Sequence, residues 1–540
     1  MNLSKKQVAV LVITGIASLV FQMYHVDFSL PIFSDNLDLT LRAFAHSQGN
    51  FEMSPNRNFG WPLFISPFLL LVDSNDFIDY SNIVRILSMS VSTFTILPMY
   101  LLSRKFFDKK YSLMAVSLLA FEPNLNRNAG FGLTEPLFTL ILIGSFYFII
   151  NSNNNKYLYL SFLLGGISYW VRPMGLVMFF VLSIIYLVIL RKSAKLVKYL
   201  VCVGLFLLAI SPVPILRYEQ YGDPFHYGDV SKGFVDTTSK LHADNVSSVS
   251  VSEYIQKNGI ITFIHNFILN GIYNVFIGLA KVSLPYLIFM VPIGAVLTLI
   301  ISDQNKRYFL ANWVLILISS ISLIIVFAVI VEIRYLFPLI PFLIIFSTFA
   351  IQKVTEFKWN PFSKSEQKKK IFLLLVLAFM ISSSAVFTFY RWDRPDVIKE
   401  NEEIEFAKYL RKNLEGKIFD DSRATNYFYY VTITNNGIFK TIYLNSDGEN
   451  QPLSTIHNLE KVQIHGNSLD EIISEGEKLD LTHIIFNGEG QFFYKFLNNA
   501  YYNEEKYPFL IKVFDSEKEG YKKLKVKVFK IDYEKFHEMI

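Results

Sequence analysis

The sequence contains a single cysteine in 540 residues, which excludes an internal disulfide and any metal site built from several cysteines. Proline and glycine are also scarce, at 19 and 25 residues, too few for a disordered or collagen-like chain. Charged residues make up only 18% of the chain, whereas hydrophobic residues make up 52%. This balance is too apolar for an ordinary soluble enzyme and indicates a membrane protein.

Several motifs that would point to other functions are missing from the sequence. It has no Walker A motif and no Gly-x-Gly-x-x-Gly motif. The sequence therefore shows no nucleotide-binding motif that could drive transport. Its histidines lack the spacing of a zinc site. Its lysines and arginines lie beside apolar runs rather than on a basic face with exposed aromatic residues, so we do not expect nucleic acid as a partner.

Long apolar runs are what the sequence has in abundance. A transmembrane helix needs about 20 mostly apolar residues to cross a core of roughly 30 Å, and we identify about eleven such runs. They lie at approximately 8–24, 81–103, 111–123, 134–150, 157–171, 174–190, 197–216, 283–301, 308–329, 335–351 and 371–389. The pair at 157–171 and 174–190 can also be read as one hairpin that bends at Arg172-Pro173.

The positions of lysine and arginine predict the orientation, because short cytoplasmic loops carry an excess of both. With eleven alternating spans, the basic clusters fall on one side: Lys5-Lys6, Arg104-Lys105, Lys109-Lys110, Lys156, Arg191-Lys192, Lys306-Arg307 and Lys353 to Lys370. We therefore expect a multi-pass protein of the cell membrane with a cytoplasmic N-terminus and a first external loop at 25–80. Residues 1–24 lack a small-residue cleavage site, so we expect a retained helix rather than a signal peptide.

The last 151 residues differ in charge and pattern from the rest. Residues 390–540 carry a net charge of −5, against +10 for residues 1–389. The tail contains one helical pattern at 401–416 and four β-rich runs, at 417–421, 427–434, 482–487 and 523–531. The predicted fold class is therefore a mainly α-helical polytopic membrane domain, 1–389, followed by a small extracytoplasmic α/β domain, 390–540.

The first external loop contains the first candidate site. Asp35 and Asp38 begin an amphipathic stretch about ten residues after the first span, which predicts a helix lying along the membrane interface. A carboxylate there can take a proton from a hydroxyl nucleophile, and partial burial is expected to raise its pKa. The alternative is that Asp35 only caps a helix after Ser34.

Further charged residues lie at the external ends of other spans. Glu135 begins the span at 134–150, Arg172 ends the span at 157–171, and Arg334 and Tyr335 lie between the spans at 308–329 and 335–351. Arginine guanidinium groups that lie beside carboxylates at the same depth in the membrane can bind an anionic lipid headgroup together with a substrate that carries a hydroxyl group. Alternatively, each arginine extends toward lipid headgroups or pairs structurally with Glu135 or Glu332.

The order of these motifs carries a family resemblance. The resemblance rests on "SD" and "SQGNF" in the first loop, then "FGWPLFISPFL", "TEPLF", "GGISYWVRPMGL", "LRYEQYGDPF" and "RYLFPLIP". In this order, over roughly residues 1–350, the chain resembles the GT-C superfamily of multispan glycosyltransferases. It is most similar to the branch with protein mannosyltransferases and lipid A aminoarabinose transferases.

The resemblance implies transfer of a sugar from a polyprenyl or dolichyl phosphate carrier to a protein, lipid or glycan acceptor on the outer face. It implies Asp35 as the catalytic base, and Arg334 and Tyr335 as the pair near the carrier phosphate. Glu135 matches an acidic residue near the junction of the third and fourth spans, and Arg172 is a second phosphate or sugar contact. Asp38 is the candidate for a second acidic role, although many members have Asp-Glu or Asp-x-Asp at this point.

Direct displacement by a single base would invert the anomeric centre. No cofactor is certain, but a divalent cation bound by Asp35, Asp38 and Glu135 is possible. Arg57 and Arg217, also external, are weaker candidates. The alternative functions are a polytopic transporter or lipid flippase and a membrane-anchored sensor whose function lies in 390–540. A transporter is expected to have polar groups near the midplane rather than at one face.

Overall fold

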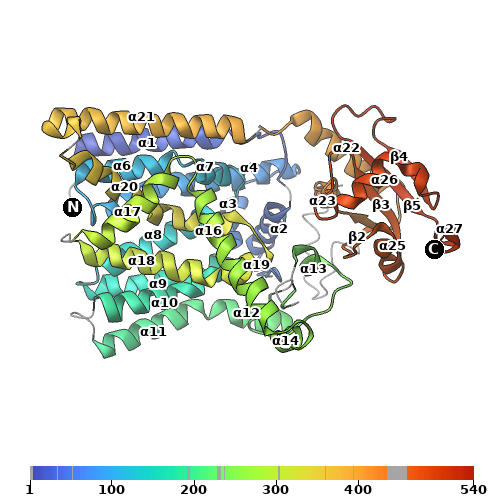
Figure 1. Ribbon diagram of the computed structural model, residues 1–540, viewed down its shortest axis with the longest axis horizontal. Coiled ribbons are helices and arrows are strands. Elements are labelled where there is room, and N and C mark those ends of the chain that lie inside the picture. Colours follow the sequence, from blue (N-terminus) through green and yellow to red (C-terminus); the bar gives the residue numbers. More distant parts are fainter. Residues whose placement is uncertain are drawn as a thin grey trace.

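The computed structural model describes residues 4–32, 34–51, 53–190, 195–227, 233–235, 237–301, 305–358, 360–392, 394–434 and 459–539. The topology signal predicted at Arg191-Lys192 lies outside these residues. A long helical bundle makes up most of the molecule, and a compact domain with a β-sheet lies at one end of it (Figure 1). The described N-terminal helix begins at the opposite end of the bundle (Figure 1).

Twenty-one α-helices precede the sheet domain in the described residues. The first twelve are α1 (Lys5–Met23), α2 (Asp35–Ser47), α3 (Gly60–Leu69), α4 (Phe77–Phe94), α5 (Ile96–Ser103), α6 (Lys109–Ala120), α7 (Pro123–Gly130), α8 (Glu135–Ile150), α9 (Asn155–Val171), α10 (Val177–Ile184), α11 (Leu196–Ile210) and α12 (Pro212–Tyr221). The others are α13 (Thr238–His242), α14 (Val251–Asn258), α15 (Ile260–Phe263), α16 (Asn270–Val282), α17 (Leu287–Ile300), α18 (Lys306–Ser322), α19 (Ile324–Val329), α20 (Ile340–Glu356) and α21 (Glu366–Arg391). Short 3₁₀ or π segments join some of them: η1 (Pro173–Leu176), η2 (Ile185–Ile189), η4 (Ile264–Leu269), η5 (Ile333–Leu339) and η6 (Pro361–Lys364).

The first helix shows why this bundle suits a bilayer. Its buried face carries polar side chains: Gln7, Thr14, Ser18 and Gln22. Its exposed face carries apolar ones: Val8, Val12, Ile13, Ile16 and Val20. A helix in water has the reverse arrangement, whereas membrane helices turn polar groups toward the bundle interior. Polar side chains of this face bind inside the protein, as when Gln7 donates to the hydroxyl of Tyr100 at 2.7 Å.

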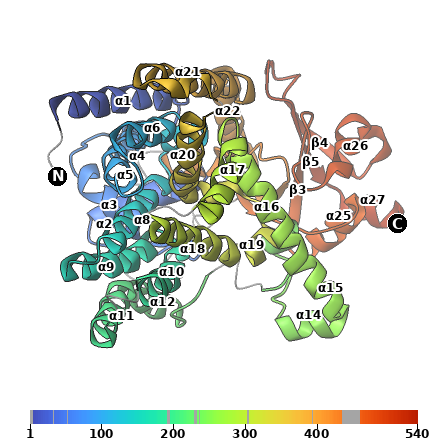
Figure 2. The same ribbon diagram turned by 60° about the vertical axis from the view of Figure 1, so that its left-hand side comes forward.

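Six described helical stretches are long and apolar enough to cross a membrane: 5–23, 77–103, 196–221, 260–282, 333–356 and 366–391. Four shorter apolar helices accompany them: 60–69, 135–150, 173–189 and 287–300. The stretch 260–282 is not among the apolar runs identified from the sequence, which go directly from 197–216 to 283–301. Helix α15, the π segment η4 and helix α16 follow one another without a break in this stretch, and Figure 2 shows α15 and α16 in line, leading to α17.

The sheet domain has three layers. Its elements are α22 (Val397–Asn413), β1 (Gly416–Asp420), α23 (Phe428–Thr434), β2 (Leu459–Val462), α25 (Leu469–Glu477), β3 (Leu481–Asn487), α26 (Asn498–Tyr502), β4 (Leu510–Asp515), β5 (Val526–Ile531) and α27 (Tyr533–Met539). The strand order is β2-β1-β3-β5-β4, in which β1 pairs in parallel with β2 and β3, and β5 pairs antiparallel with β3 and β4. Alternate residues face opposite sides, so Ile484 and Ile485 enter different apolar clusters, each covered by helices.

One predicted strand is wrong. The run at 427–434 is rich in aromatic and β-branched residues, yet the structure has helix α23 over Phe428–Thr434. Tyr427 and Val431 pack against Ala407 of α22 in a buried cluster. Contact with a neighbouring helix therefore decides the conformation against the local preference for a strand, which is common because strand propensity depends strongly on context.

Hydrogen bonds join the sheet domain to the loop that precedes α14. The amide of Asp244 donates to the carbonyl of Gln463 at 2.7 Å, and the carboxylate of Asp244 accepts from the amide of Gln463 at 2.9 Å. Asn245 exchanges two further hydrogen bonds with the backbone of His465, at 2.9 and 3.0 Å. These paired contacts hold the end of β2 on the same end of the bundle as α2 (Figure 1).

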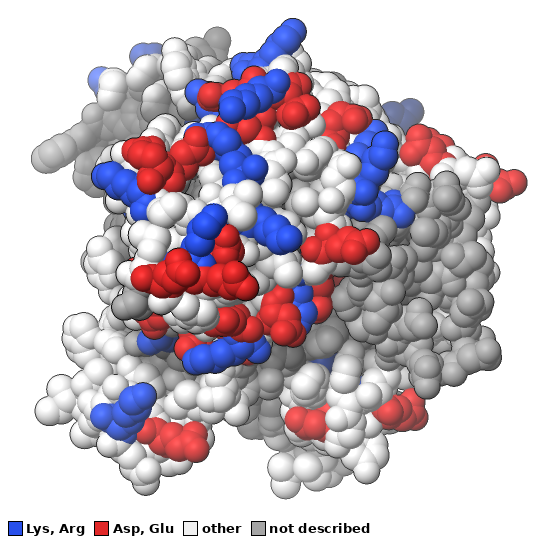
Figure 3. Space-filling view, turned by 90° about the vertical axis from the view of Figure 1, so that its right-hand side faces the viewer, with Lys and Arg blue, Asp and Glu red and all other residues white. Residues whose placement is uncertain are grey.

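The end of the molecule that carries the sheet domain shows acidic and basic side chains interleaved (Figure 3). Several are ion-paired, among them Lys399 with Glu489 at 2.5 Å and Lys512 with Glu504 at 2.7 Å. The described residues on this face therefore mix the two signs of charge rather than forming a patch of one sign.

Gly60 provides a test of how α3 is positioned. A Cβ added at Gly60 would lie 2.6 Å from the carbonyl carbon of Trp170, a backbone atom that cannot rotate away. We expect Gly60→Ala to lower the free energy of unfolding by about 1–3 kcal/mol. The measurement is thermal unfolding of the purified protein in detergent, followed by tryptophan fluorescence.

The matched control is Gly204→Ala in α11, where nothing lies within 4 Å of the added Cβ. This substitution should leave the melting temperature unchanged or raise it slightly, because alanine favours a helix. Equal melting temperatures for the two variants would contradict the close packing of α3 on α9.

Candidate functional site

The chain turns sharply just before α2. Ser34, the residue before this helix, has φ 55° and ψ −129°, in a region that residues other than glycine rarely adopt. Such backbone strain persists only where the surrounding structure imposes it, and it often accompanies functional sites. Asp35 and Asp38 follow in the first turn of α2, where the positive end of the helix dipole favours carboxylates.

Asp35 lies between two arginines from distant parts of the chain. Its Oδ1 pairs with Nη2 of Arg57 at 2.5 Å, and its Oδ2 pairs with Nη2 of Arg334 at 2.7 Å. Arg57 comes from the loop between α2 and α3, and Arg334 comes from η5. Both carboxylate oxygens are therefore engaged, and the start of α2 is joined both to the loop that follows this helix and to the segment before α20.

These contacts correct the expected direction of the pKa of Asp35. Burial opposes ionisation of the carboxyl group, but the positive charges of Arg57 and Arg334 outweigh it and hold the pKa below its usual range. The sequence analysis considered burial alone and predicted a raised pKa, which is wrong for this arrangement. Two arginines beside one carboxyl group favour its ionised form.

Asp38 belongs to the same network. Its Oδ2 pairs with Nη1 of Arg57 at 3.0 Å, and its Oδ1 pairs with Nε of Arg42 at 3.0 Å. Arg57 therefore bridges both carboxylates of α2. The sequence analysis treated Arg57 as a weaker candidate, but the structure gives it contacts with two predicted site residues. Its position in a polar loop at the external end was the signal in the sequence, but spacing alone did not show that it reaches both acids.

A second ion pair lies next to the first. Glu135, at the start of α8, has a side chain only 2% exposed, and its Oε1 pairs with Nη1 of Arg172 at 2.5 Å. The guanidinium of Arg172 lies over the ring of Tyr335, 5.2 Å from its centroid. Because Tyr335 follows Arg334 in η5, this contact links the two pairs, and Arg172 is close enough to act on the charge of Asp35.

The structure thus brings all six predicted site residues together at one end of the bundle: Asp35, Asp38, Glu135, Arg172, Arg334 and Tyr335. They come from α2, α8, η5 and the end of α9. Such a cluster of fixed positive charges beside carboxylates can bind an anionic group and hold a carboxylate next to it. Their roles in catalysis are not established by this placement and remain predictions.

The ion pairs also show whether these side chains fit the divalent cation considered in the sequence analysis. In the described part of the chain, no three His, Cys, Asp or Glu residues are grouped as ligands for a metal ion. Asp35 and Glu135, two of the three proposed ligands, are each paired with an arginine. Guanidinium groups at these distances disfavour a nearby cation, so the side chains as placed do not fit a metal bound by Asp35, Asp38 and Glu135.

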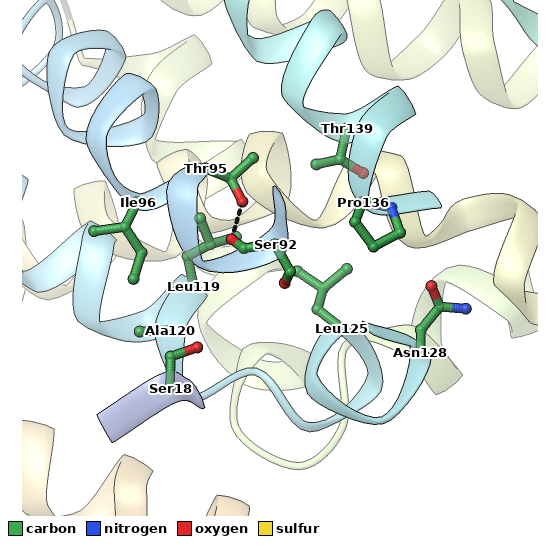
Figure 4. A pocket seen from close by; sticks show the side chains of 10 residues that line it. All are labelled: Ser18, Ser92, Thr95, Ile96, Leu119, Ala120, Leu125, Asn128, Pro136 and Thr139. Carbon is green, nitrogen blue, oxygen red and sulfur yellow. Dashed lines mark hydrogen bonds between the residues drawn. The ribbon is translucent and has the colours of Figure 1, made fainter. Parts of the chain in front are cut away.

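A small cavity lined by both polar and apolar side chains lies inside the bundle beside the first turn of α8 (Figure 4). Pro136 and Thr139 of α8 form one wall, and Ser18, Ser92 and Asn128 are among the other lining residues. Its volume of about 20 Å³ has room for roughly one water molecule. It is therefore too small for a sugar or an isoprenoid chain.

The fold is that of a polytopic membrane protein with a cluster of charged side chains at one end of its bundle. A family model described as dolichyl-phosphate-mannose-protein mannosyltransferase matches residues 62–215. No curated protein sequence matches the chain. The matched residues run from α3 to α12 and include Glu135 and Arg172.

Solved structures show the same fold. The oligosaccharyltransferase of Archaeoglobus fulgidus in complex with Zn and sulfate has a TM-score of 0.57 at 12% identity, covering 89% of this chain and 68% of that one. ArnT from Cupriavidus metallidurans bound to undecaprenyl phosphate has a TM-score of 0.53 at 11% identity, covering 96% and 97%. The archaeal oligosaccharyltransferase AglB with an inhibitory peptide and a dolichol-phosphate has a TM-score of 0.51 at 12% identity, covering 89% and 69%.

These likenesses confirm the predicted resemblance to GT-C glycosyltransferases. They also confirm the predicted fold class, a mainly helical polytopic protein with a small α/β domain at its C-terminal end. The number of eleven spans stays a prediction.

The buried pair of Glu135 and Arg172 generates a stability test. Arg172→Met leaves the Glu135 carboxylate buried without its partner, and breaking a buried pair in this way costs about 3–5 kcal/mol. We therefore expect a large fall in the melting temperature in detergent. The double variant Glu135→Gln/Arg172→Met should recover part of the loss, because the remaining side chain is neutral. A double variant as unstable as Arg172→Met alone would contradict the pairing.

Proposed function

We propose that this chain is an integral-membrane glycosyltransferase of hexosyltransferase type. It transfers a sugar from a polyprenyl or dolichyl phosphate to an acceptor at the extracytoplasmic face. The observation that carries this proposal is the contact of Asp35 with Arg334, which places a carboxylate beside a fixed positive charge from a distant segment. The match to a mannosyltransferase family model and the likeness to structures holding undecaprenyl phosphate or a dolichol-phosphate support it.

Each residue of the cluster has a role in the proposed reaction. Arg334 and Arg172 hold the carrier phosphate, which is already a competent leaving group. Asp35 removes the proton of the acceptor hydroxyl as that oxygen attacks the anomeric carbon, and the configuration at this carbon is inverted. Asp38 and Tyr335 line the site. The protein therefore contributes mainly orientation, charge stabilisation and one proton acceptor.

The resting ion pair also sets the order of events in this proposal. Arg334 pairs with Asp35, and an incoming phosphate competes for the same guanidinium. When Arg334 turns to the phosphate, Asp35 loses one of the positive charges that lower its pKa. Its carboxylate then becomes a stronger base at the moment when the donor is in place.

The proposed orientation follows from the same arrangement. We propose that residues 1–389 form the catalytic membrane domain with a cytoplasmic N-terminus, and that residues 390–540 form an extracytoplasmic domain. The N-terminal helix begins at one end of the bundle, while the sheet domain and α2 lie at the other (Figure 1). The hydrogen bonds from Asp244 and Asn245 support a position of the sheet domain beside the site, where it can present an acceptor or cover the site.

Asp35→Asn tests the proposed base. We expect transfer to fall by about 10²–10⁴-fold, because the amide cannot accept the proton. The substrate is the polyprenyl-phosphate lipid fraction of source cells grown on radiolabelled glucose. It is added to membranes that contain only the variant enzyme, and label leaving the lipid fraction is counted.

Asp79→Asn is the matched control, since Asp79 is an exposed carboxylate in the first turn of α4. It should transfer at the wild-type rate. Full transfer by Asp35→Asn would refute the assignment of the base. An absence of transfer by the wild-type enzyme, with movement of lipid across the bilayer instead, would favour the flippase alternative.

Binding of undecaprenyl phosphate tests the role of Arg334 without knowledge of the sugar or the acceptor. Arg334→Met removes a charge-assisted hydrogen bond, so we expect affinity to fall by roughly tenfold or more. Asp35→Asn should tighten binding, because it removes the carboxylate that competes for Arg334. Native mass spectrometry of the detergent-solubilised protein measures both, with the exposed Arg307→Met as an unaffected control. Weaker binding by Asp35→Asn would contradict the proposed competition.

A further inference from the structure

Arg217 is a buried arginine that the proposed reaction does not use. It lies in α12, and its side chain is fully buried. Nη1 donates to the carbonyls of Pro55 and His226, and Nη2 donates to the carbonyl of Arg57 at 3.3 Å and to Oδ1 of Asn58 at 3.0 Å. No carboxylate in the described residues lies within ion-pairing distance of it. A buried guanidinium needs hydrogen-bond acceptors, and here the loop at 55–58 supplies most of them.

The cluster around Arg217 reaches the end of α9. The guanidinium of Arg217 lies 3.9 Å from the ring centroid of Tyr227. The hydroxyl of Tyr227 donates to Oδ1 of Asn58 at 3.1 Å and lies 3.2 Å from the hydroxyl of Tyr169. The side-chain amide of Asn58 donates to the carbonyl of Tyr169. Since Tyr169 precedes Arg172 by three residues, one buried cluster joins the loop at 55–58 to the segment that carries Arg172.

Two residues at the end of α12 form hydrogen bonds with Met53, which lies in the same loop. Oε1 of Gln220 accepts from the amide of Met53 at 3.0 Å, and the hydroxyl of Tyr221 donates to the carbonyl of Met53 at 2.7 Å. The backbone on the N-terminal side of Arg57 is therefore held as well. Arg57 itself then extends its side chain to Asp35 and Asp38.

We propose that Arg217 is a positioning residue that holds the backbone at Arg57 and, through Arg57, orients the carboxylates of Asp35 and Asp38. This inference rests on the proposed function, because it gives Arg217 a part in the reaction of Asp35. Arg57 has a long and flexible side chain, and anchoring its backbone limits the positions that its guanidinium reaches. Lysine cannot replace Arg217, since a single ammonium group does not present the planar fork that contacts four oxygens at once.

A double-mutant cycle tests this inference. We expect Arg217→Lys to lower the transfer of label from the radiolabelled polyprenyl-phosphate lipid fraction by about 100-fold, the usual effect of a small misplacement in a site. Arg57→Gln should lower it by a similar factor. Because Arg217 acts through Arg57, the double variant should be no slower than Arg57→Gln alone.

Multiplied losses in the double variant would overturn the inference, since they would show that Arg217 acts independently of Arg57. A purely structural role would lower the melting temperature and the amount of folded protein, and these are measured on the same samples. Arg104→Lys is the matched control, because Arg104 donates to a backbone carbonyl, that of Phe107, at the opposite end of the bundle. It should transfer at the wild-type rate.

Tyr227→Phe keeps the inference testable if Arg217→Lys fails to fold. It retains the ring beneath the guanidinium but loses the hydroxyl that joins Asn58 to Tyr169. We expect a loss of transfer of roughly tenfold that disappears in the Arg57→Gln background. A loss that persists in that background would overturn the inference, whereas an absence of transfer by the wild-type enzyme would refute the proposed function itself.

Discussion

Charge compensation at one end of the bundle is the constraint on which the rest of this structure depends. Carboxylates close to a lipid boundary are costly unless a positive group or a set of hydrogen bonds compensates them. Asp35 meets this condition with arginines from two distant segments, and Glu135 meets it with Arg172. Because each partner comes from a different element, the pairs also determine how α2, α8, α9 and η5 meet. The same contacts that make the acids tolerable therefore assemble the site.

Buried arginines that bind backbone carbonyls hold the chain on both sides of α2, the helix that begins at Asp35. Arg217 binds the loop after α2, as described above. Arg85 of α4 binds the segment before α2, where its guanidinium donates to the carbonyls of Asp27, Leu30 and Pro31. A planar fork suits this task because it reaches several carbonyls that no helix or strand satisfies. The strained backbone at Ser34 lies between these two anchors, which is the over-determined setting that such strain requires.

The sequence predicted which charged residues come together, but it did not predict how their charges act on Asp35. Charged residues beside long apolar runs pointed to the external helix ends, since few other reasons keep Glu135 or Arg334 at those positions. The two arginines on Asp35 could not be counted from spacing, because their approach depends on tertiary contacts, and the predicted direction of the pKa was therefore wrong. The helical stretch at 260–282 was missed because asparagines interrupt it. The structure satisfies them locally, as when Asn274 donates to the carbonyl of Phe327 at 2.9 Å.

The two ion pairs of the site differ in how far water reaches their side chains, and this exposure determines how easily each pair is broken. The pair of Asp35 and Arg334 has side chains 25% and 28% exposed, so water reaches it in part and weakens it. The pair of Glu135 and Arg172 is 2% and 14% exposed, and breaking a buried pair costs about 3–5 kcal/mol. Under the proposed function, an incoming phosphate displaces Asp35 from Arg334 more readily than it displaces Glu135 from Arg172. Under the proposed function, Arg334 is the mobile contact of the donor phosphate, and Glu135 serves as the permanent counterion of Arg172.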